Sequence, residues 1–510
     1  MPPSVANIVF AAGVLVLFAL DRDRAARTSK ALWLPVIWIW IVGSRAVSAW
    51  MGMDQSVSNV NQLAEGSPVD RAVFQFLLGA GLLVLLWRRK RTIAALKDNW
   101  AIVLYFSFCL ISILWSDSPD VSFKRWTKSL GDLVMVLIVV TDPNPMAALR
   151  RVFSRVGFIL LPASILLIKY YGDLGRAFDP YGWMEVTGVA TDKNLLGVTT
   201  FVLSLGAVWR ILVLLRSKGQ PGRARHLLAQ GVLLASGLLI LKMAGSATSA
   251  ACFAIGSGLM LATGLRVIGR RPAFVHALVL LIVVVAAFGM LSGADADLVH
   301  AMGRRTDFTG RTEIWKAVIH MAPNPMVGAG FETFWLGKRL EKMWSLFPVF
   351  KPNEAHDGYI EVYLNLGWAG LALIGLILVN GYFRAVATFR RNRGLGGLML
   401  AFVAAATIYS VTEAGFRMLD PIWIFLLLAI AAGHAGNQAS LKSKKLAGGK
   451  AGSQHGSHGG NRPGSKMGGR VGGKVGGKVG QPVGATSGRP LPAARGSLPW
   501  SAGGGPVEAF

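Results

Sequence analysis

The chain has 510 residues, of which 53 are Lys or Arg and 26 are Asp or Glu, giving a formal net charge of +27 at pH 7. Hydrophobic residues make up 53% of the sequence and charged residues only 15%, with a mean hydropathy of +0.48. Ordinary soluble domains carry about 25% charged residues, so this composition excludes a soluble globular enzyme and a soluble nucleic-acid binder. Cys109 and Cys252 both fall in apolar runs, which excludes a disulfide framework and a cysteine metal site. The composition predicts a membrane protein whose basic residues lie in loops and tails.

Apolar runs recur along the first 435 residues, and a run of about 20 such residues can cross a bilayer as a helix. We therefore predict an all-α polytopic membrane domain over residues 1–435, with about 12–13 transmembrane helices. The candidate spans are 4–20, 31–50, 72–87, 99–115, 127–141, 152–169, 193–213, 227–243, 248–265, 273–292, 357–379, 396–412 and 420–435. If the first run is not a membrane helix, the count is twelve.

The basic residues cluster in every second loop between these spans. Such clusters mark the cytoplasmic side of a membrane protein. The basic loops are 22–30, 88–91, 150–151, 216–225, 266–271 and 384–393. This pattern predicts an outer N-terminus and a cytoplasmic C-terminus, or two cytoplasmic ends if the first run does not cross the membrane.

The composition changes at about residue 436. Residues 436–510 are rich in Gly, Ser, Pro and Lys and contain too few apolar residues to offset the entropy of ordering a chain. We predict a disordered, basic, Gly-rich cytoplasmic tail. Its bases suit weak attraction to anionic lipid headgroups, and a merely solubilising tail is an equal alternative.

One outer loop is far longer than the others, at about residues 292–356. Long loops in compact proteins are usually functional. A helix starting after Thr309 or Gly310 would carry Arg311 in its first turn and Trp315 one turn later, at a headgroup-level position. This loop is the first candidate for the chemistry.

Several bases lie on the predicted outer face, against the general charge pattern. They are Lys124, Arg125, Arg176, Lys193, Arg304, Arg305, Arg311 and Arg417. Lys193 follows Thr191 and Asp192, which could cap the next helix, and a helix N-terminus next to a base suits an anion such as phosphate. Headgroup anchoring or a surface ion pair is the alternative for any single base.

His356 stands at the start of the span 357–379, in Ala355-His-Asp-Gly-Tyr359. On a helix it would share a face with Tyr359 and Tyr363, while Asp357 and Glu361 would share another. Polar and acidic residues that enter a membrane helix are costly and tend to face a cavity. This segment is the second candidate for the chemistry.

Four stretches resemble the O-antigen ligase and polymerase superfamily, and within it the ExoQ-like exopolysaccharide polymerisation proteins. They are Trp115-Ser-Asp-Ser-Pro-Asp-Val-Ser-Phe-Lys-Arg125, Thr191-Asp-Lys-Asn-Leu-Leu-Gly197, Thr309-Gly-Arg-Thr-Glu-Ile-Trp315, and Ala355-His-Asp-Gly-Tyr through Leu366-Gly-Trp-Ala-Gly370. The resemblance implies a bacterial inner-membrane glycosyltransferase of GT-C-like architecture. Such proteins transfer a glycan from a polyprenyl-diphosphate carrier to an acceptor hydroxyl at the periplasmic face, with no metal and no other cofactor. They work in the membrane beside chain-length regulators and export proteins, and not on nucleic acid.

The resemblance also implies functional roles for Arg311 and His356, and it places Lys193 where an Arg would be expected. The guanidinium of Arg311 suits phosphate oxygens. His356, titrating near neutrality, could orient the acceptor hydroxyl and accept its proton.

Other residues could assist at the same site. The bases proposed to hold the second phosphate are Lys193, Arg125 and Arg305, and the alternative acid or base residues are Glu313 and Glu361. Our leading hypothesis is polymerisation of lipid-linked repeat units. Ligation of the glycan to a lipid or protein acceptor uses the same motifs and stays open, as does a flippase of lipid-linked sugars, although no clear internal repeat supports a transporter.

Overall fold

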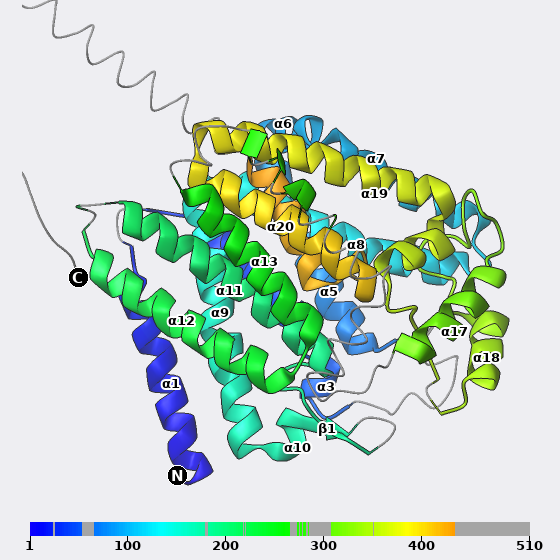
Figure 1. Ribbon diagram of the computed structural model, residues 1–510, viewed down its shortest axis with the longest axis horizontal. Coiled ribbons are helices and arrows are strands. Elements are labelled where there is room, and N and C mark those ends of the chain that lie inside the picture. The colour runs from blue at the N-terminus through cyan, green and yellow to red at the C-terminus, as the bar shows by residue number, and fades with distance from the viewer. Residues whose placement is uncertain are drawn as a thin grey trace, which may run out of the picture. The chain divides into compact units, whose positions relative to one another are not determined.

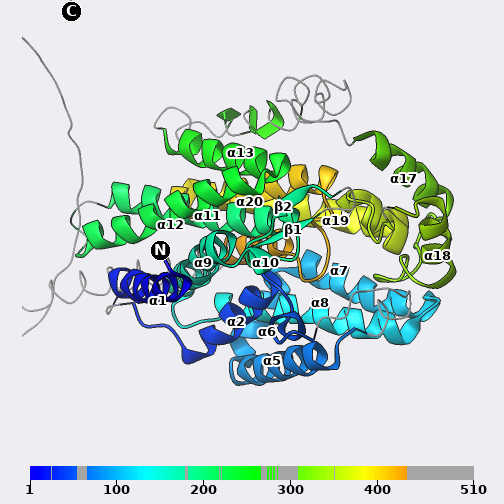
Figure 2. The ribbon, with the colours of Figure 1, turned by 90° about the horizontal axis from the view of Figure 1, so that it is seen from below.

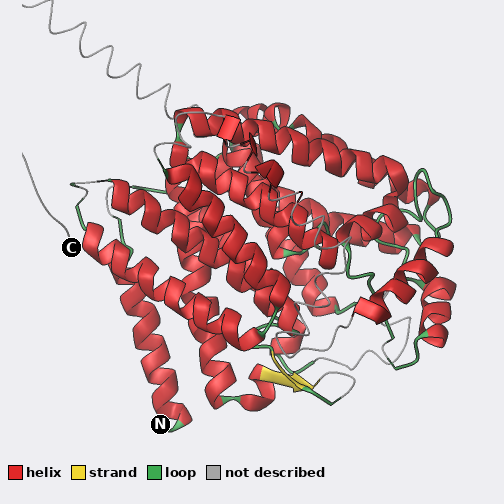
Figure 3. Ribbon diagram, viewed as in Figure 1, coloured by secondary structure: helices red, strands yellow, loops and turns green. Residues whose placement is uncertain are grey.

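The computed structural model describes residues 1–433 except 24–25, 54–65, 179–181, 218, 220, 350 and most of 266–307. The predicted tail 436–510, Arg305 and most of the predicted span 273–292 lie outside the described residues. The described part is almost entirely helical (Figure 3), which confirms the predicted all-α fold class. Its two short strands, β1 (Arg176–Phe178) and β2 (Met184–Val186), pair antiparallel with Arg176 opposite Val186.

The described helices include most of the predicted apolar runs in the same chain order, with bounds that differ by up to twelve residues. They are α1 (Pro3–Leu20), α2 (Trp33–Val42), α3 (Val47–Trp50), α5 (Pro68–Trp87), α6 (Arg89–Asp98), α7 (Trp100–Ile111), α8 (Pro119–Val140), α9 (Pro145–Tyr170), α10 (Gly172–Gly175), α11 (Lys193–Arg216), α12 (Arg223–Ala244), α13 (Ala247–Gly264), α17 (Phe308–His320), α18 (Gly337–Leu346), α19 (Gly358–Arg391) and α20 (Arg393–Thr412). A final helix covers Pro421–Gly433.

Among the described residues, eight helices are long and apolar enough to cross a membrane, or nine if the sharply bent pair α6 and α7 forms one span. This confirms a multi-pass membrane protein. The predicted runs 31–50 and 420–435 instead form the shorter apolar helices Lys30–Val42 and Pro421–Gly433. The predicted span 127–141 forms most of the C-terminal part of α8, whose N-terminal part carries Lys124 and Arg125.

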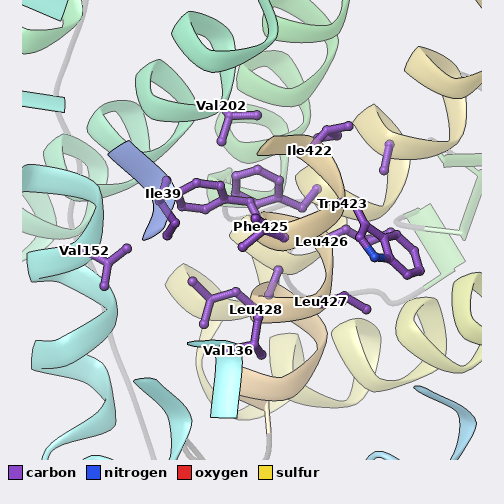
Figure 4. Close-up of a cluster of buried hydrophobic side chains, with 14 of the residues drawn as sticks. Ile39, Val136, Val152, Val202, Ile422, Trp423, Phe425, Leu426, Leu427 and Leu428 are labelled. Carbon is purple, nitrogen blue, oxygen red and sulfur yellow. The ribbon is translucent and has the colours of Figure 1, made fainter. Parts of the chain in front are cut away.

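The centre of the bundle is the helix Pro421–Gly433, in which every residue is buried. Figure 4 shows Ile422, Phe425 and Leu428 of this helix among apolar side chains that α2, α8, α9 and α11 contribute. In α1, by contrast, only Ala6 and Leu17 are buried, so most of its apolar surface faces outward, as expected for a helix in lipid. The helix Pro421–Gly433 is apolar because it is buried among longer helices, and hydropathy alone cannot distinguish such a helix from one that crosses the membrane.

The long loop and the helices beside it gather at one end of the bundle (Figure 1). There α17 and α18 lie next to the N-terminal part of α19, whereas α1 and α12 lie at the opposite end. In the perpendicular view, α5 and α8 lie on the side away from α13 (Figure 2). The candidate residues from distant parts of the sequence therefore have one region in which they can meet.

The loop between α17 and α18 is fixed to a break inside α19 at Gly367. This residue has φ +64°, and a Cβ there would lie 2.3 Å from the carbonyl carbon of Met326. The N–H of Trp368 donates to the carbonyl of Pro325 at 2.9 Å, and the N–H of Ala369 donates to that of Met326 at 3.0 Å. Only glycine combines this backbone conformation with so close an approach.

Candidate functional site

Four segments of the chain bring six charged side chains together. Arg311 comes from α17, Glu332 from the loop between α17 and α18, Glu354 and His356 from the segment before α19, and Glu413 and Arg417 from the segment after α20. We name this group the Arg311–His356 cluster, and its members are Arg311, Glu332, Glu354, His356, Glu413 and Arg417.

Arg311 is held by the C-terminal end of α20. Its Nη1 donates to the carbonyl of Thr412 at 2.6 Å, and its Nη2 lies 3.4 Å from Oε1 of Glu413. The guanidinium side chain is 24% exposed and the Glu413 carboxylate only 8%. A partly exposed, permanently charged fork supported from one side can still bind an anion from the other.

His356 lies between two carboxylates. Its Nδ1 is 2.9 Å from Oε1 of Glu354 and 3.5 Å from Oε2 of Glu413, and these contacts are ionic rather than well-aligned hydrogen bonds. The sequence predicted that His356 lies on a helix, but α19 begins two residues later, at Gly358. Asp357 caps this helix by accepting from the N–H of Ile360 at 2.8 Å. The φ of His356 is +52°, a conformation that non-glycine residues adopt rarely and mostly where the surroundings impose it.

The two carboxylates change the charge state of His356. Burial by itself would lower the pKa of this imidazole, but contact with Glu354 and then Glu413 outweighs it and raises the pKa from 6.5 to about 10. Burial likewise opposes ionisation of Glu354, yet His356, followed by Arg417 and Arg311, lowers the pKa of Glu354 to about 2. His356 is therefore an imidazolium at neutral pH, contrary to the expectation that it titrates near neutrality.

Arg417 links Glu332 to the rest of the cluster. Its Nη1 lies 2.8 Å from Oε2 of Glu354, and its Nε lies 3.3 Å from Oε2 of Glu332. Burial opposes its charge, but Glu332 and Glu354 raise the pKa of Arg417 above its ordinary value. Glu332 has φ +56°, so a second cluster residue is held in a rare backbone conformation.

Trp315 and Glu361 fix the backbone that precedes His356. The Nε1 of Trp315 donates to the carbonyl of Ala355 at 2.7 Å, so Trp315 supports the site, and its headgroup-level position stays a prediction. The buried carboxylate of Glu361 accepts from the N–H of Ala355 and from Nε1 of Trp335 at 3.0 Å. Glu361 thus has a positioning role in this geometry.

The other alternative acid or base, Glu313, is exposed on the surface of α17. Arg311 lies on the same helix but is partly buried, because the helix turns it toward the end of α20. Glu313 stays a sequence prediction without a contact to the cluster among the interactions of the described residues.

Lys193 lies at the start of α11, close to the cluster but directed elsewhere. Its Nζ is 2.6 Å from Oε1 of Glu185 in β2. Asp192 caps the helix as predicted, because its carboxylate accepts from the N–H groups of Asn194 and Leu195 at 2.9 Å each. The backbone N–H groups at this helix N-terminus, which were expected to suit a phosphate, are therefore already hydrogen-bonded to Asp192. The contact with the cluster comes from Asn194, whose Nδ2 donates to Oε2 of Glu413 at 3.3 Å.

Arg125 approaches the cluster from α8. Its Nη1 donates to the backbone carbonyl of Glu332. Together with Arg417 it lines a cavity between α5 and α8. Two of the predicted anion-binding residues therefore contact the same cluster, Arg311 through Glu413 and Arg125 through the backbone of Glu332.

Sequence reasoning missed the three glutamates that organise these cations: Glu332, Glu354 and Glu413. Two signals could have found them. Glu354 lies two residues before His356, and Glu413 directly follows the span 396–412 at the end predicted to face outward. Nothing in the sequence indicates that Glu332 faces Arg417, because the loop that carries it folds back on α19.

A metal ion is a further possibility for such a group. One ligand atom each from Glu354, His356 and Glu413 lies within 4.8 Å of the others. Both carboxylates already pair with an Arg, Glu413 with Arg311 and Glu354 with Arg417, so a cation bound here would compete with these ion pairs.

The fold and the cluster define a polytopic membrane protein with a charged site at one end of its helices. The family model described as O-Antigen ligase matches residues 230–375, a range that contains Arg311 and His356. The chain is also 29% identical over 286 residues to "Exopolysaccharide production protein ExoQ" of Rhizobium meliloti (strain 1021). That alignment covers 54% of this chain and 62% of the relative, so the chain spans about three fifths of that relative's length. Both matches confirm the predicted resemblance to ExoQ-like members of the O-antigen ligase superfamily.

Proposed function

We propose that the protein polymerises lipid-linked oligosaccharide repeat units in exopolysaccharide or O-antigen-type biosynthesis. It would transfer a glycan from a polyprenyl-diphosphate donor at the periplasmic face of the bacterial inner membrane. The observation that carries this proposal is the Arg311–His356 cluster, in which cations suited to a diphosphate and carboxylates suited to a hydroxyl proton lie side by side. The similarity to the exopolysaccharide production protein supports a role in exopolysaccharide production.

In this reaction, the bond between the anomeric carbon of the donor glycan and its diphosphate oxygen breaks. A bond forms between that carbon and the acceptor hydroxyl oxygen, and the polyprenyl diphosphate leaves with the electron pair. Catalysis then requires positioning and stabilisation of the developing negative charge. Arg311, whose guanidinium is supported by Thr412 and Glu413, suits that role.

The acceptor hydroxyl must lose its proton to a nearby base. An imidazolium cannot accept a proton, so we assign this step to the carboxylate of Glu413, 3.5 Å from Nδ1 of His356. His356 then contributes positive charge to the diphosphate, beside Arg311. The reaction needs no metal under this assignment, because Arg311, His356 and Arg417 supply the charge.

A ligase reaction is the second candidate, and the description of the matching family model favours it. The same cluster would transfer the glycan to a lipid or protein acceptor. The two reactions differ only in the acceptor, so the product separates them: a ladder of repeat units indicates a polymerase, and single transfer indicates a ligase. We also propose that a polymerase of this kind works with chain-length regulators and export proteins.

The test replaces Arg311 and His356 singly with Ala and measures polymer made by membranes that contain each variant. Loss of one preorganised charged group typically costs about 10²–10³-fold in rate, so polymer should fall by that factor while lipid-linked repeat units accumulate. Lys316→Ala and His320→Ala are matched controls, because both side chains are exposed on α17. Wild-type polymer from Arg311→Ala or His356→Ala, at equal protein levels, would disprove the site.

A further inference from the structure

A second basic site lies beside the cluster, in a cavity of about 190 Å³ between α5, α8 and the segment after α20. Five basic side chains line it: Arg71, Lys124, Arg125, Lys128 and Arg417. Among the lining residues that the structure describes there is no Asp or Glu. The nearby carboxylates of Glu332 and Glu354, which pair with Arg417, and of Asp70, whose charge acts on Lys128, are not among the lining residues, so basic groups predominate at the cavity wall.

The remaining walls are apolar and aromatic. Trp38 and Phe74 line the cavity, and their rings pack edge to face with centroids 4.7 Å apart. Nε1 of Trp38 donates to Oδ1 of Asp132 at 2.8 Å, which fixes the indole. The Nζ of Lys128 lies 5.9 Å from the ring centroid of Phe74. Such a lining fits an anionic group that carries an apolar chain, rather than a fully hydrated anion.

The surface beside the cavity also suits a lipid. On α5, Phe76, Leu83 and Leu86 are 73%, 62% and 67% exposed. A helix in this position that meets the criteria for a membrane span presents these side chains to acyl chains. A ligand whose charged end occupies the cavity can therefore keep its apolar chain along α5 in the bilayer.

We propose that this cavity binds the diphosphate of a second lipid-linked glycan, the acceptor, while the Arg311–His356 cluster binds the diphosphate of the donor. This inference rests on the proposed function and extends it, because an acceptor on a lipid diphosphate makes the reaction a polymerisation. Arg417 belongs to both sites: it lines the cavity and pairs with Glu354, which contacts His356. The two anions are thus separated by a single shared guanidinium, which reduces their mutual repulsion.

Binding by the full-length protein tests the proposal without requiring turnover. The protein is placed in nanodiscs of phosphatidylcholine, which carry no net charge, and titrated calorimetrically with farnesyl diphosphate, a short polyprenyl diphosphate. We expect two binding events. Lys128→Gln should weaken one of them on the order of tenfold, as loss of one charge-assisted contact does, and Arg311→Ala should weaken the other. Lys128→Arg should restore the affinity, and Lys338→Gln, an exposed lysine on α18, should change neither event.

Two further arms identify the ligand. Inorganic pyrophosphate should bind the cavity more weakly than farnesyl diphosphate, because it lacks the chain that contacts Phe74 and α5. Phosphatidylglycerol added to the nanodiscs should not abolish the event that depends on Lys128.

Unchanged binding of farnesyl diphosphate in Lys128→Gln, with normal membrane insertion, would overturn the proposal. So would a single binding event in the wild type. Competition by phosphatidylglycerol as strong as that of farnesyl diphosphate would also overturn it, because it would indicate an ordinary lipid-headgroup site. Failure of the proposed function is a separate outcome. It would appear as normal polymer from Arg311→Ala, whatever the Lys128 variants bind.

Discussion

Replacing Glu413 with Gln tests the electrostatics of the cluster directly. Glu413 lies 3.5 Å from Nδ1 of His356 and 3.4 Å from Nη2 of Arg311, and its side chain is only 8% exposed. The amide keeps the shape of the carboxylate but removes its charge. His356 then keeps Glu354 as its only close carboxylate within the cluster, so the pKa of His356 should fall from its value of about 10.

The size of that fall follows from the distance. Two unit charges about 4 Å apart attract by about 4 kcal/mol at an effective dielectric constant of about 20. The imidazole is 32% exposed, so we reduce this by half for solvent screening, to about 2 kcal/mol. One pKa unit corresponds to about 1.4 kcal/mol, so the pKa of His356 should fall by roughly 1.5 units.

NMR titration of the histidine side chains in the detergent-solubilised protein measures this shift, with His356→Gln assigning the resonance. Glu313→Gln is the matched control, because that glutamate is exposed on α17. A pKa of His356 that stays near 10 in Glu413→Gln, with the fold intact, would refute the electrostatic reasoning. So would an equal shift in Glu313→Gln.

The same pKa predicts how stability depends on pH. The pKa of His356 is higher in the folded protein, about 10, than its ordinary 6.5. The stabilisation from its protonation is therefore complete below about pH 6.5 and is lost as the pH rises through 10. The melting temperature of the wild type should decrease between these values, and that of His356→Gln should decrease less.

Three further predictions concern the fold and the tail. Gly367→Ala should lower the free energy of unfolding by about 1–3 kcal/mol, because the φ of Gly367 is +64° and a Cβ there would meet Met326. Gly375→Ala, in the same helix but with open space around the residue, should not destabilise the protein, and thermal unfolding in detergent compares the two variants. Asp21→Ala should lower the melting temperature more than Glu341→Ala, an exposed site, because Asp21 pairs with buried Arg210 and His226, and equal melting temperatures would contradict this. Truncation after residue 440 should leave polymer formation intact, and lost activity with normal membrane insertion would show that the tail is required.

The sequence by itself determined the fold class and the places where chemistry could occur. Apolar runs of sufficient length predict membrane helices without tertiary information, because the bilayer sets their length and requires their backbones to be internally hydrogen-bonded. Asp192 as a helix cap and the helix around Arg311 were also predictable, since capping and helical turns are local. The motifs around Arg311 and His356 are short continuous stretches, so the resemblance to the O-antigen ligase superfamily could also be seen in the sequence.

Contacts between distant segments were decided only by the tertiary structure. The run 420–435 is apolar in either case, and only packing shows that it forms a short buried helix at the centre of the bundle. His356 was expected to be a neutral base, but its charge depends on Glu354 and on Glu413, which is 57 residues away in the sequence. An ionisable group takes its pKa from the charges and the burial around it. Local sequence can therefore name the residues of such a site, but the fold determines which of them carry a proton.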